Sequence, residues 1–402
     1  MKKEVSRATA AALCVLTAAL SVNVTYAVLL RRQEAQFPNY EANHAMFGKL
    51  AEIREKVADY YVGEYNAQDA LDMACTGYMM GVGDRWSGYL SKKEYEDATL
   101  SLHGKSVGIG VYFLYSQTEN TMRAIEVYRG SPAEAAGVRA NDLLLGANGK
   151  TLAEDGYEAV YNTVLGEEGE PVEITYQSAA TGQTHTVSMV RREVETTMVS
   201  GKMLDAQTGY LRIYNFREHS EAQFETVLND LLAQGAERLI FDVRNDPGGS
   251  VDSLCKMLDP LLPEGTIMTL DSKAGKEQVY ESDADALNLP MAVIVNAESI
   301  SAAEFFAAAL QEYGKAVVVG EQTIGKGYSQ RLYPLSDGSA LRLSDNTYYT
   351  PQGKSLIGVG VVPDEVVPMD ETDRQTFYFL APEEDVQLAA ARAALDKIGS
   401  EK

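Results

Sequence analysis

A hydroxyl and an amine that could act together lie in the segment 291–330. Residues 291–295 are continuously apolar, which is typical of a buried central strand, and the turn after them carries Ser299 and Ser301. Lys326 follows on a later loop, between two glycines that give the backbone freedom to aim it. A serine at a strand-to-helix turn and a lysine nearby are the two groups that a serine nucleophile with a lysine base requires.

Each of the two groups also has a simpler interpretation. Residues 302–313 predict a helix, so Ser301 stands at or just before its N-terminus, where the helix dipole favours developing negative charge but where a serine also serves as a plain cap. Lys326 could be an exposed loop charge. It can act as a base only when neutral, which requires burial to lower its pKa from about 10.4 toward neutrality.

A glycine turn could supply the other half of such a site. The stretch 238–243, with four apolar residues, predicts a buried strand, and Gly248 and Gly249 follow just before the next predicted helix. The backbone N–H of Ala302 and one from Gly248 or Gly249 could form an oxyanion hole for acyl transfer. The alternative is an ordinary glycine turn, and the pattern alone does not separate the two.

The composition excludes several other classes of site. None of the four histidines lies in a motif beside a candidate serine, and no GxSxG elbow is present, so a histidine-dependent triad is poorly supported. The three cysteines are too few and too scattered for a disulfide framework or a zinc site, and we expect neither metal nor cofactor. The net charge of -23 argues against nucleic acid as a partner, because phosphate binding needs a basic surface.

The elements that must position these groups fall into successive regions of a multidomain α/β chain. Residues 40–103 have helical periodicity, 104–193 contain short β-rich runs, 194–370 alternate strands with helices, and 371–402 predict a helical tail. In the third region Ser220 and Gln223 match a capping box. In the tail, Val386, Ala389, Ala390 and Ala393 form the expected apolar face, which would pack on the body or on a second subunit.

The β-rich region resembles a PDZ domain. The similarity rests on a glycine loop, a short helix in 130–137 with proline at its start and glycine at its end, and the apolar run 143–145. The resemblance implies that Gly108, Ile109, Gly110 and Val111 form a carboxylate-binding loop. Successive backbone N–H groups in such a loop bind anions, and the edge of the following strand can accept an extended peptide, so the module would hold a free C-terminus.

The amino-terminal region predicts export. Residues 8–30 carry no charge, Lys2 and Lys3 precede them, and two arginines end the run. This length is close to the roughly 20 residues of a spanning helix, so we expect 1–32 to be a membrane anchor or, alternatively, a cleaved signal peptide. Either places most of the chain outside the cytoplasm. A buried soluble helix is a third interpretation.

Taken together, these motifs resemble the carboxyl-terminal processing proteases, also called tail-specific proteases. The most specific parts are the segment 296–304 and the segment 320–327 with Gln330. In that family the lysine lies 25 residues after the serine and a glutamine four residues later, which selects Ser301 over Ser299. The resemblance implies that Ser301 attacks the peptide carbonyl, Lys326 accepts and returns the proton, Gln330 orients the lysine, and the core has a crotonase-like fold.

We therefore expect a serine endopeptidase with an extracytoplasmic catalytic domain that binds polypeptides by their C-terminus. Its partners would be those substrates, the membrane, and a second copy or an adaptor or activator protein. The main alternative is a catalytically silent scaffold that binds peptides through the PDZ groove, against which the intact serine, lysine and glutamine count. A crotonase-like acyl-CoA enzyme is a broader alternative, disfavoured by the PDZ module and the secretory leader.

Overall fold

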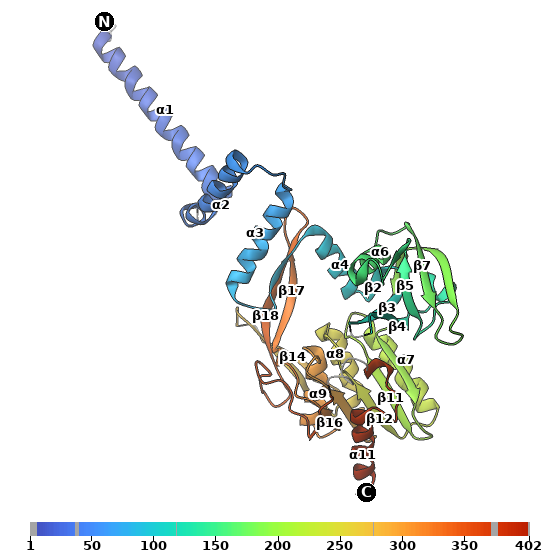
Figure 1. Ribbon diagram of the computed structural model, residues 1–402. Helices are drawn as coiled ribbons and strands as arrows, with labels where there is room; N and C mark the ends of the chain where they lie inside the picture. The colour runs from blue at the N-terminus through green and yellow to red at the C-terminus, as the bar shows by residue number, and fades with distance from the viewer. Residues whose placement is uncertain (1–5, 37–39, 118, 276, 371–376, 401–402) are drawn as a thin grey trace. The chain divides into compact units, whose positions relative to one another are not determined.

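The computed structural model describes residues 6–36, 40–117, 119–275, 277–370 and 377–400, and the chain forms two compact units, Met1–Leu71 and Asp72–Lys402 (Figure 1). The first unit contains α1 (Arg7–Gln36), α2 (Tyr40–Tyr60) and the start of α3 (Ala67–Val82). Helix α1 includes the uncharged run 8–30. Within the described residues, however, no helix is both long enough and apolar enough to cross a membrane, so the expected span is not supported.

The second unit begins with connecting elements and a β-rich module. After α3 come β1 (Gly88–Leu90) and α4 (Lys92–Leu102), and then β2 (Lys105–Gly108), which pairs with β9 (Arg192–Glu195). The module's sheet runs in the order β3-β4-β5-β7-β8, with β6 beside β5. Its strands are β3 (Val111–Ser116), β4 (Thr121–Val127), β5 (Leu143–Ala147), β6 (Lys150–Thr151), β7 (Pro171–Gln177) and β8 (Thr184–Val190).

This module has its own hydrophobic core. Helices α5 (Pro132–Ala135) and α6 (Gly156–Val164) accompany the sheet, and Ile109, Leu144 and Ile174 lie in the core with Val160 of α6. Ser131 caps α5 with its hydroxyl and proline opens the helix, as the sequence predicts. Strand β3 lies at one end of the sheet order, so one of its edges has no strand partner among the described residues and could pair with a further strand.

The larger core is built on a mostly parallel sheet in the order β10-β11-β12-β15-β16-β19. Its strands are β10 (Val199–Met203), β11 (Thr208–Ile213), β12 (Arg238–Asp242), β15 (Met291–Val295), β16 (Ala316–Gly320) and β19 (Glu365–Val366). All neighbouring strands are parallel except β10 and β11. Every residue of β15 is buried, which explains its continuous apolar sequence: both faces of this strand are covered.

Helices cover the two faces. Phe241 and Val293 belong to the cluster that packs against α7 (Ser220–Ala233), α8 (Val251–Leu258) and α9 (Ala302–Glu312), whereas Ile240 and Ile294 face α11 (Val386–Ser400). The tail helix therefore packs on the body of its own chain. The expected apolar face of that helix is wrong: Leu388, Ala391, Ala394 and Leu395 are buried, and Val386 is exposed.

The capping box expected at α7 is also wrong. His219 occupies the cap position in a left-handed conformation, and Ser220 is the first helical residue. The Gln223 side chain instead accepts hydrogen bonds from the backbone N–H groups of Met198, at 2.8 Å, and Val199. The Gln223 amide therefore bonds to the backbone at the start of β10, whereas the local pattern predicts that it bonds to the N-terminus of α7.

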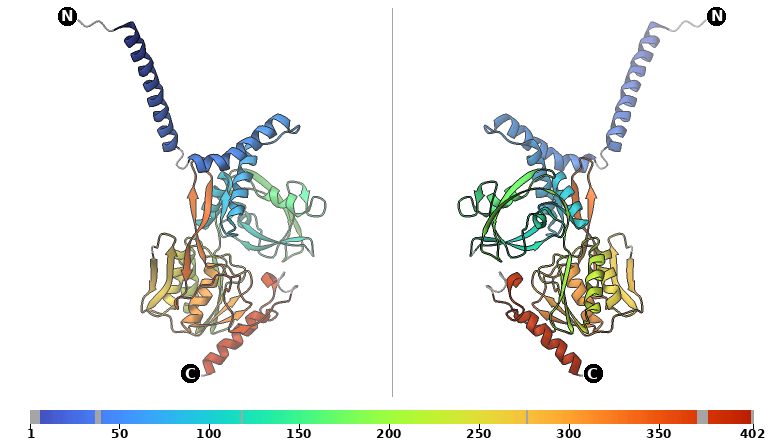
Figure 2. Two further views of the ribbon diagram at one scale, coloured as in Figure 1. Left: turned by 90° about the vertical axis from the view of Figure 1, so that its left-hand side faces the viewer. Right: turned by 90° about the vertical axis from the view of Figure 1, so that its right-hand side faces the viewer.

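A second sheet of the core has the order β1-β18-β13-β14, with β17 beside β18. It contains β13 (Gly265–Ser272), β14 (Glu277–Ser282), β17 (Tyr328–Pro334) and β18 (Ala340–Tyr349). Strands β17 and β18 form a long antiparallel hairpin, drawn in orange in Figures 1 and 2. Because β1 pairs with β18, the segment just before β1 is brought beside the start of β17.

Candidate active site

Ser301 lies on a strained turn between β15 and α9. Its backbone has φ 61° and ψ -112°, a conformation that residues other than glycine rarely adopt and that costs on the order of 1–3 kcal/mol. The helix begins at the next residue, Ala302, so the serine stands at its N-terminus, as the sequence predicts. Ser299 is different: it is fully buried, and its hydroxyl donates to the Val243 carbonyl at 2.8 Å.

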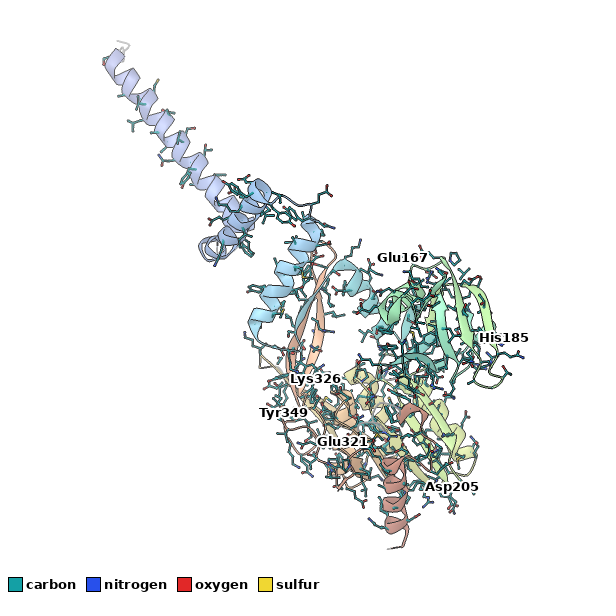
Figure 3. All side chains as sticks on the ribbon, in the orientation of Figure 1. Glu167, His185, Asp205, Glu321, Lys326 and Tyr349 are labelled. Atoms are coloured by element: carbon teal, nitrogen blue, oxygen red, sulfur yellow. The ribbon has the colours of Figure 1, made fainter. Side chains whose placement is uncertain are left out.

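Lys326 lies on the loop between β16 and β17, near the base of the β17–β18 hairpin (Figure 3). The lysine is 9% exposed, so it is not a free loop charge. Its Nζ donates to Gln330 Oε1 at 2.9 Å. The Gln330 amide nitrogen donates to the backbone carbonyl of Trp86, which fixes the orientation of the amide and leaves its oxygen facing the lysine.

The electrostatic surroundings of Lys326 favour the neutral amine. Burial lowers the pKa of the lysine to about 8, and the nearby Arg342 cation acts in the same direction, while the carboxylates of Glu304 and Asp84 oppose it. The Trp86 ring lies 4.9 Å from Nζ, a contact that stabilises the protonated form. With this pKa, a sizeable fraction of the lysine is unprotonated at mildly alkaline pH.

Glu304 links the serine turn to the lysine loop. Its side chain is fully buried. One carboxylate oxygen accepts from the backbone N–H of Ser301 at 2.8 Å and of Lys326 at 3.0 Å. The other accepts from the Thr323 hydroxyl at 2.6 Å and the Gly325 N–H at 2.7 Å. No role for Glu304 is predicted from the sequence, although its place three residues after Ser301 matches the capping-box pattern S-x-x-E.

Tyr348 of β18 supports the same loop from the other side. The tyrosine is 3% exposed, and its hydroxyl donates to the backbone carbonyl of Lys326. Burial raises the pKa of this phenol, so it remains a neutral donor. Its ring packs edge-on against Phe305 of α9, with 5.5 Å between ring centroids. The run 348–355 also resembles the family, but no role for Tyr348 follows from the sequence, because nothing local indicates that it contacts a carbonyl 22 residues earlier.

The glycine turn after β12 lies directly against the serine. A Cβ placed on Gly248 would come within 2.9 Å of both the Ser301 Cβ and the Ala302 backbone nitrogen. The Gly248 N–H, however, donates to Asp246 Oδ1 at 2.7 Å and is buried. Gly249 is exposed. Of the two glycines, Gly249 is the one whose N–H makes no hydrogen bond within the described residues.

Ser301 and Lys326 are brought to one site but are not bonded to each other. No hydrogen bond between Ser301 Oγ and Lys326 Nζ is present in the described part of the chain, where the lysine donates to Gln330 instead. Such bonds are often long before substrate binds. Among the same residues, no group of three or more histidine, cysteine, aspartate or glutamate side chains could hold a metal ion.

The residues of the expected carboxylate loop lie in the β-rich module, apart from the Ser301 turn. The Ile109 carbonyl accepts from Ala133 N at 3.0 Å, and the Gly110 carbonyl accepts from Tyr128 N at 2.9 Å. Gly110 has φ 78° and lies against Ser131, where any Cβ would come within 2.3 Å of the serine Cβ. Only glycine fits this position. The loop leads into Val111, the first residue of edge strand β3.

Comparison with known proteins agrees with this architecture. The model of the peptidase family S41 matches residues 207–367, and the model of the PDZ domain matches residues 124–178. A carboxyl-terminal-processing protease of Picosynechococcus is 31% identical over 312 residues, covering 77% of this chain and 75% of the relative. A carboxy-terminal-processing protease of Bartonella bacilliformis is 27% identical over 356 residues, covering 86% of this chain and 80% of the relative.

A solved structure shares the fold. A Bacteroides fragilis protein assigned to the S41 proteases superimposes with a TM-score of 0.57 at 18% identity, over 81% of this chain and 90% of the other. The chain thus belongs to the carboxyl-terminal-processing proteases of peptidase family S41. It is a serine-type peptidase with a PDZ domain, as the sequence analysis predicts.

Glu304→Gln tests whether the buried carboxylate holds the site together. A glutamine of the same shape would point an NH2 group at two of the four donors that the carboxylate now accepts, so the serine turn and the lysine loop should separate. We expect peptide cleavage to fall by about 100-fold or more, since misplacement by about 1 Å can cost this much. The measurement is kcat/KM, with circular dichroism as the control for folding. Cleavage within about twofold of the wild-type rate would contradict this role.

Proposed function

We propose that the chain is a serine endopeptidase in which Ser301 is the nucleophile and Lys326 the general base. The observation that carries the proposal is the buried lysine with a pKa of about 8, held by Gln330 near a serine at a helix N-terminus. Ser301 Oγ would bond to the scissile carbonyl carbon while its proton passes to neutral Nζ. The lysine would return that proton to the leaving amine, and water would then release the acyl group with the same base.

Gln330 and the glycine turn would complete the site. Gln330, held by the Trp86 carbonyl, would orient the lysine amine. The N–H groups of Ala302 and Gly249 would receive the oxyanion, an assignment supported by the exposure of Gly249 and the engagement of Gly248 with Asp246. Gly248 could contribute only after its N–H leaves the aspartate.

Substrates would be polypeptides captured by their C-terminus in the PDZ domain. The free edge of β3 and the left-handed Gly110 before it support docking at Gly108, Ile109, Gly110 and Val111. We assign residues 104–193 to this domain, 194–370 to a crotonase-like protease core, and 371–402 to the tail. The uncharged run 8–30 after a basic start supports work on proteins outside the cytoplasm.

Ser301→Ala and Lys326→Ala test the dyad. Each variant should cleave an unfolded protein with a free apolar C-terminus at least about 1,000-fold more slowly than the wild type, because each removes one of two groups that act as a unit. Lys326→Arg should be equally inactive, since arginine keeps the charge but cannot become neutral. The measurement is kcat under saturating substrate. Unchanged cleavage by Ser301→Ala and Lys326→Ala would refute the assignment.

The pH dependence of kcat/KM tests the identity of the base. The lysine must be neutral to accept the serine proton, and its pKa in the folded chain is about 8. The rate should therefore rise roughly tenfold per pH unit below this value and level off above it. A midpoint at about 6.5, the usual pKa of histidine, would contradict a lysine base.

Amidation of the substrate tests docking by the C-terminus. Replacing the terminal carboxylate with an amide should slow cleavage by the wild type several-fold, because the loop N–H groups lose their anion. Gly110→Ala should abolish that difference, since its Cβ would collide with Ser131 and strain the loop. Equal rates for acid and amide with the wild type would remove the carboxylate-capture role while leaving the dyad intact.

A further inference from the structure

A cavity with both polar and apolar lining lies between the PDZ strands and the glycine turn of the protease core. Its volume is about 250 Å³. Tyr112 of β3 and Glu126 of β4 line one side, and Asn245 and Pro247, just before Gly248, line another. Arg217, which follows β11, also lines it. The cavity thus touches both the strand expected to hold a substrate and the turn expected to stabilise its oxyanion.

Arg217 has the titratable groups of Tyr128 and Asp246 as neighbours but is not hydrogen-bonded to either in the described structure. Among the residues that the structure describes, its guanidinium makes no hydrogen bond and no ion pair, although it is half-buried. The other buried arginines are all engaged: Arg191 donates to backbone carbonyls, Arg212 faces Asp242 at 3.7 Å, and Arg244 pairs with Asp242 and Asp385. An unpaired, desolvated cation in a chain of net charge -23 is unexpected unless it meets a ligand.

Four tyrosines that line the cavity provide hydroxyl donors for an anion and aromatic rings for the apolar part of a ligand. Tyr112, Tyr128, Tyr214 and Tyr378 line the cavity with rings and hydroxyl groups. Burial raises the pKa of both Tyr112 and Tyr128 to about 12, so these hydroxyls stay neutral and can donate. A guanidinium beside neutral phenol donors is a fitting environment for a carboxylate, which accepts hydrogen bonds and has no donor of its own.

The carboxylate of Glu126 disfavours the binding of a second carboxylate in this cavity. Its carboxylate lines the same cavity, 3.5 Å from the Tyr214 hydroxyl. Burial raises the pKa of Glu126, with hydrogen bonds to Thr197 and Tyr214 opposing the shift. In its ionised form Glu126 would repel a bound carboxylate, so Arg217 and Glu126 have opposite effects on the same ligand.

We propose that the Arg217 cavity binds a carboxylate of the polypeptide substrate. The carboxylate could be the terminal α-carboxylate or the side chain of an aspartate or glutamate near the C-terminus, because the two groups have the same chemistry. The proposal rests on the peptidase function proposed above. It adds a charge-selective subsite to the backbone N–H groups of the glycine loop. Where the bound group is a side chain, acidic tails are the preferred class of substrate.

The test uses four forms of one unfolded polypeptide substrate. They combine an acid or an amide at the C-terminus with either Asp and Glu or their Asn and Gln counterparts in the last ten or so residues. Values of kcat/KM are measured for the full chain and for Arg217→Gln, Arg217→Lys, Glu126→Gln and Arg129→Gln. Arg129 is the matched control, since it neighbours Tyr128 in sequence but is exposed and does not line the cavity.

We expect the wild type to prefer the acidic member of at least one pair by roughly 10- to 100-fold, the range of a hydrogen bond to a charged group. Arg217→Gln should lose that preference, Arg217→Lys should keep part of it, Glu126→Gln should increase it, and Arg129→Gln should leave it unchanged. Loss confined to the acid and amide pair identifies the terminal carboxylate, and loss confined to the side-chain pair identifies Asp or Glu.

The proposal would be overturned if Arg217→Gln kept the wild-type preference for the acidic member of both substrate pairs. It would also be overturned if the wild type preferred the acidic member of neither pair. If Arg217→Gln does not fold, the other two variants still test the proposal: Arg217→Lys should weaken the preference for acidic substrates and Glu126→Gln should strengthen it, and the absence of both changes would overturn the proposal. Ser301→Ala is run in parallel: cleavage by that variant would refute the peptidase mechanism itself. A wild type that cleaves all four substrates equally refutes carboxylate recognition both in this cavity and at the glycine loop, and leaves the dyad intact.

Discussion

The buried carboxylate of Glu304 is the interaction on which the site depends. Its two oxygens accept from the backbone of Ser301, from Gly325 and Lys326, and from Thr323, so one side chain joins the turn after β15 to the loop after β16. A charge at 0% exposure is costly unless its hydrogen bonds are satisfied, and here they are. The same contacts help to hold Ser301 in a conformation that an isolated turn would not keep.

The second sheet gives Lys326 its environment. The β17–β18 hairpin carries Gln330 and Tyr348, and β1 pairs with β18, which delivers the Trp86 carbonyl to the Gln330 amide. Burial by these strands lowers the pKa of the lysine, and Arg342 of β18 adds to the effect. Two segments that are far apart in the sequence, the one that carries Trp86 and the β17–β18 hairpin, therefore form the surroundings of one amine.

The PDZ domain and the protease core also meet at polar groups. Tyr112 of β3 lies 6.4 Å, centroid to centroid, from Tyr378 of the tail, and Glu126 of β4 reaches Tyr214 beyond β11. The tail is tied to the strand end before the glycine turn by the buried pair of Arg244 and Asp385. Since the overall charge is strongly negative, any capture of a substrate anion must depend on such local donors rather than on the field of the whole protein.

The sequence by itself determined the local elements and the family. The continuous apolar run of β15, the helix after Ser301 and the Pro-to-Gly helix of the PDZ domain follow from short-range patterns, because periodicity and capping act within a few residues. Tertiary structure decided the features that depend on distant groups. These are the four hydrogen bonds to Glu304, the lowered pKa of Lys326, the hydrogen bond from Met198 N–H to the Gln223 side chain, and the buried face of α11. It also turned the Gly248 N–H toward Asp246 and left Arg217 unpaired in the described structure, because burial and orientation arise only when separate strands pack together.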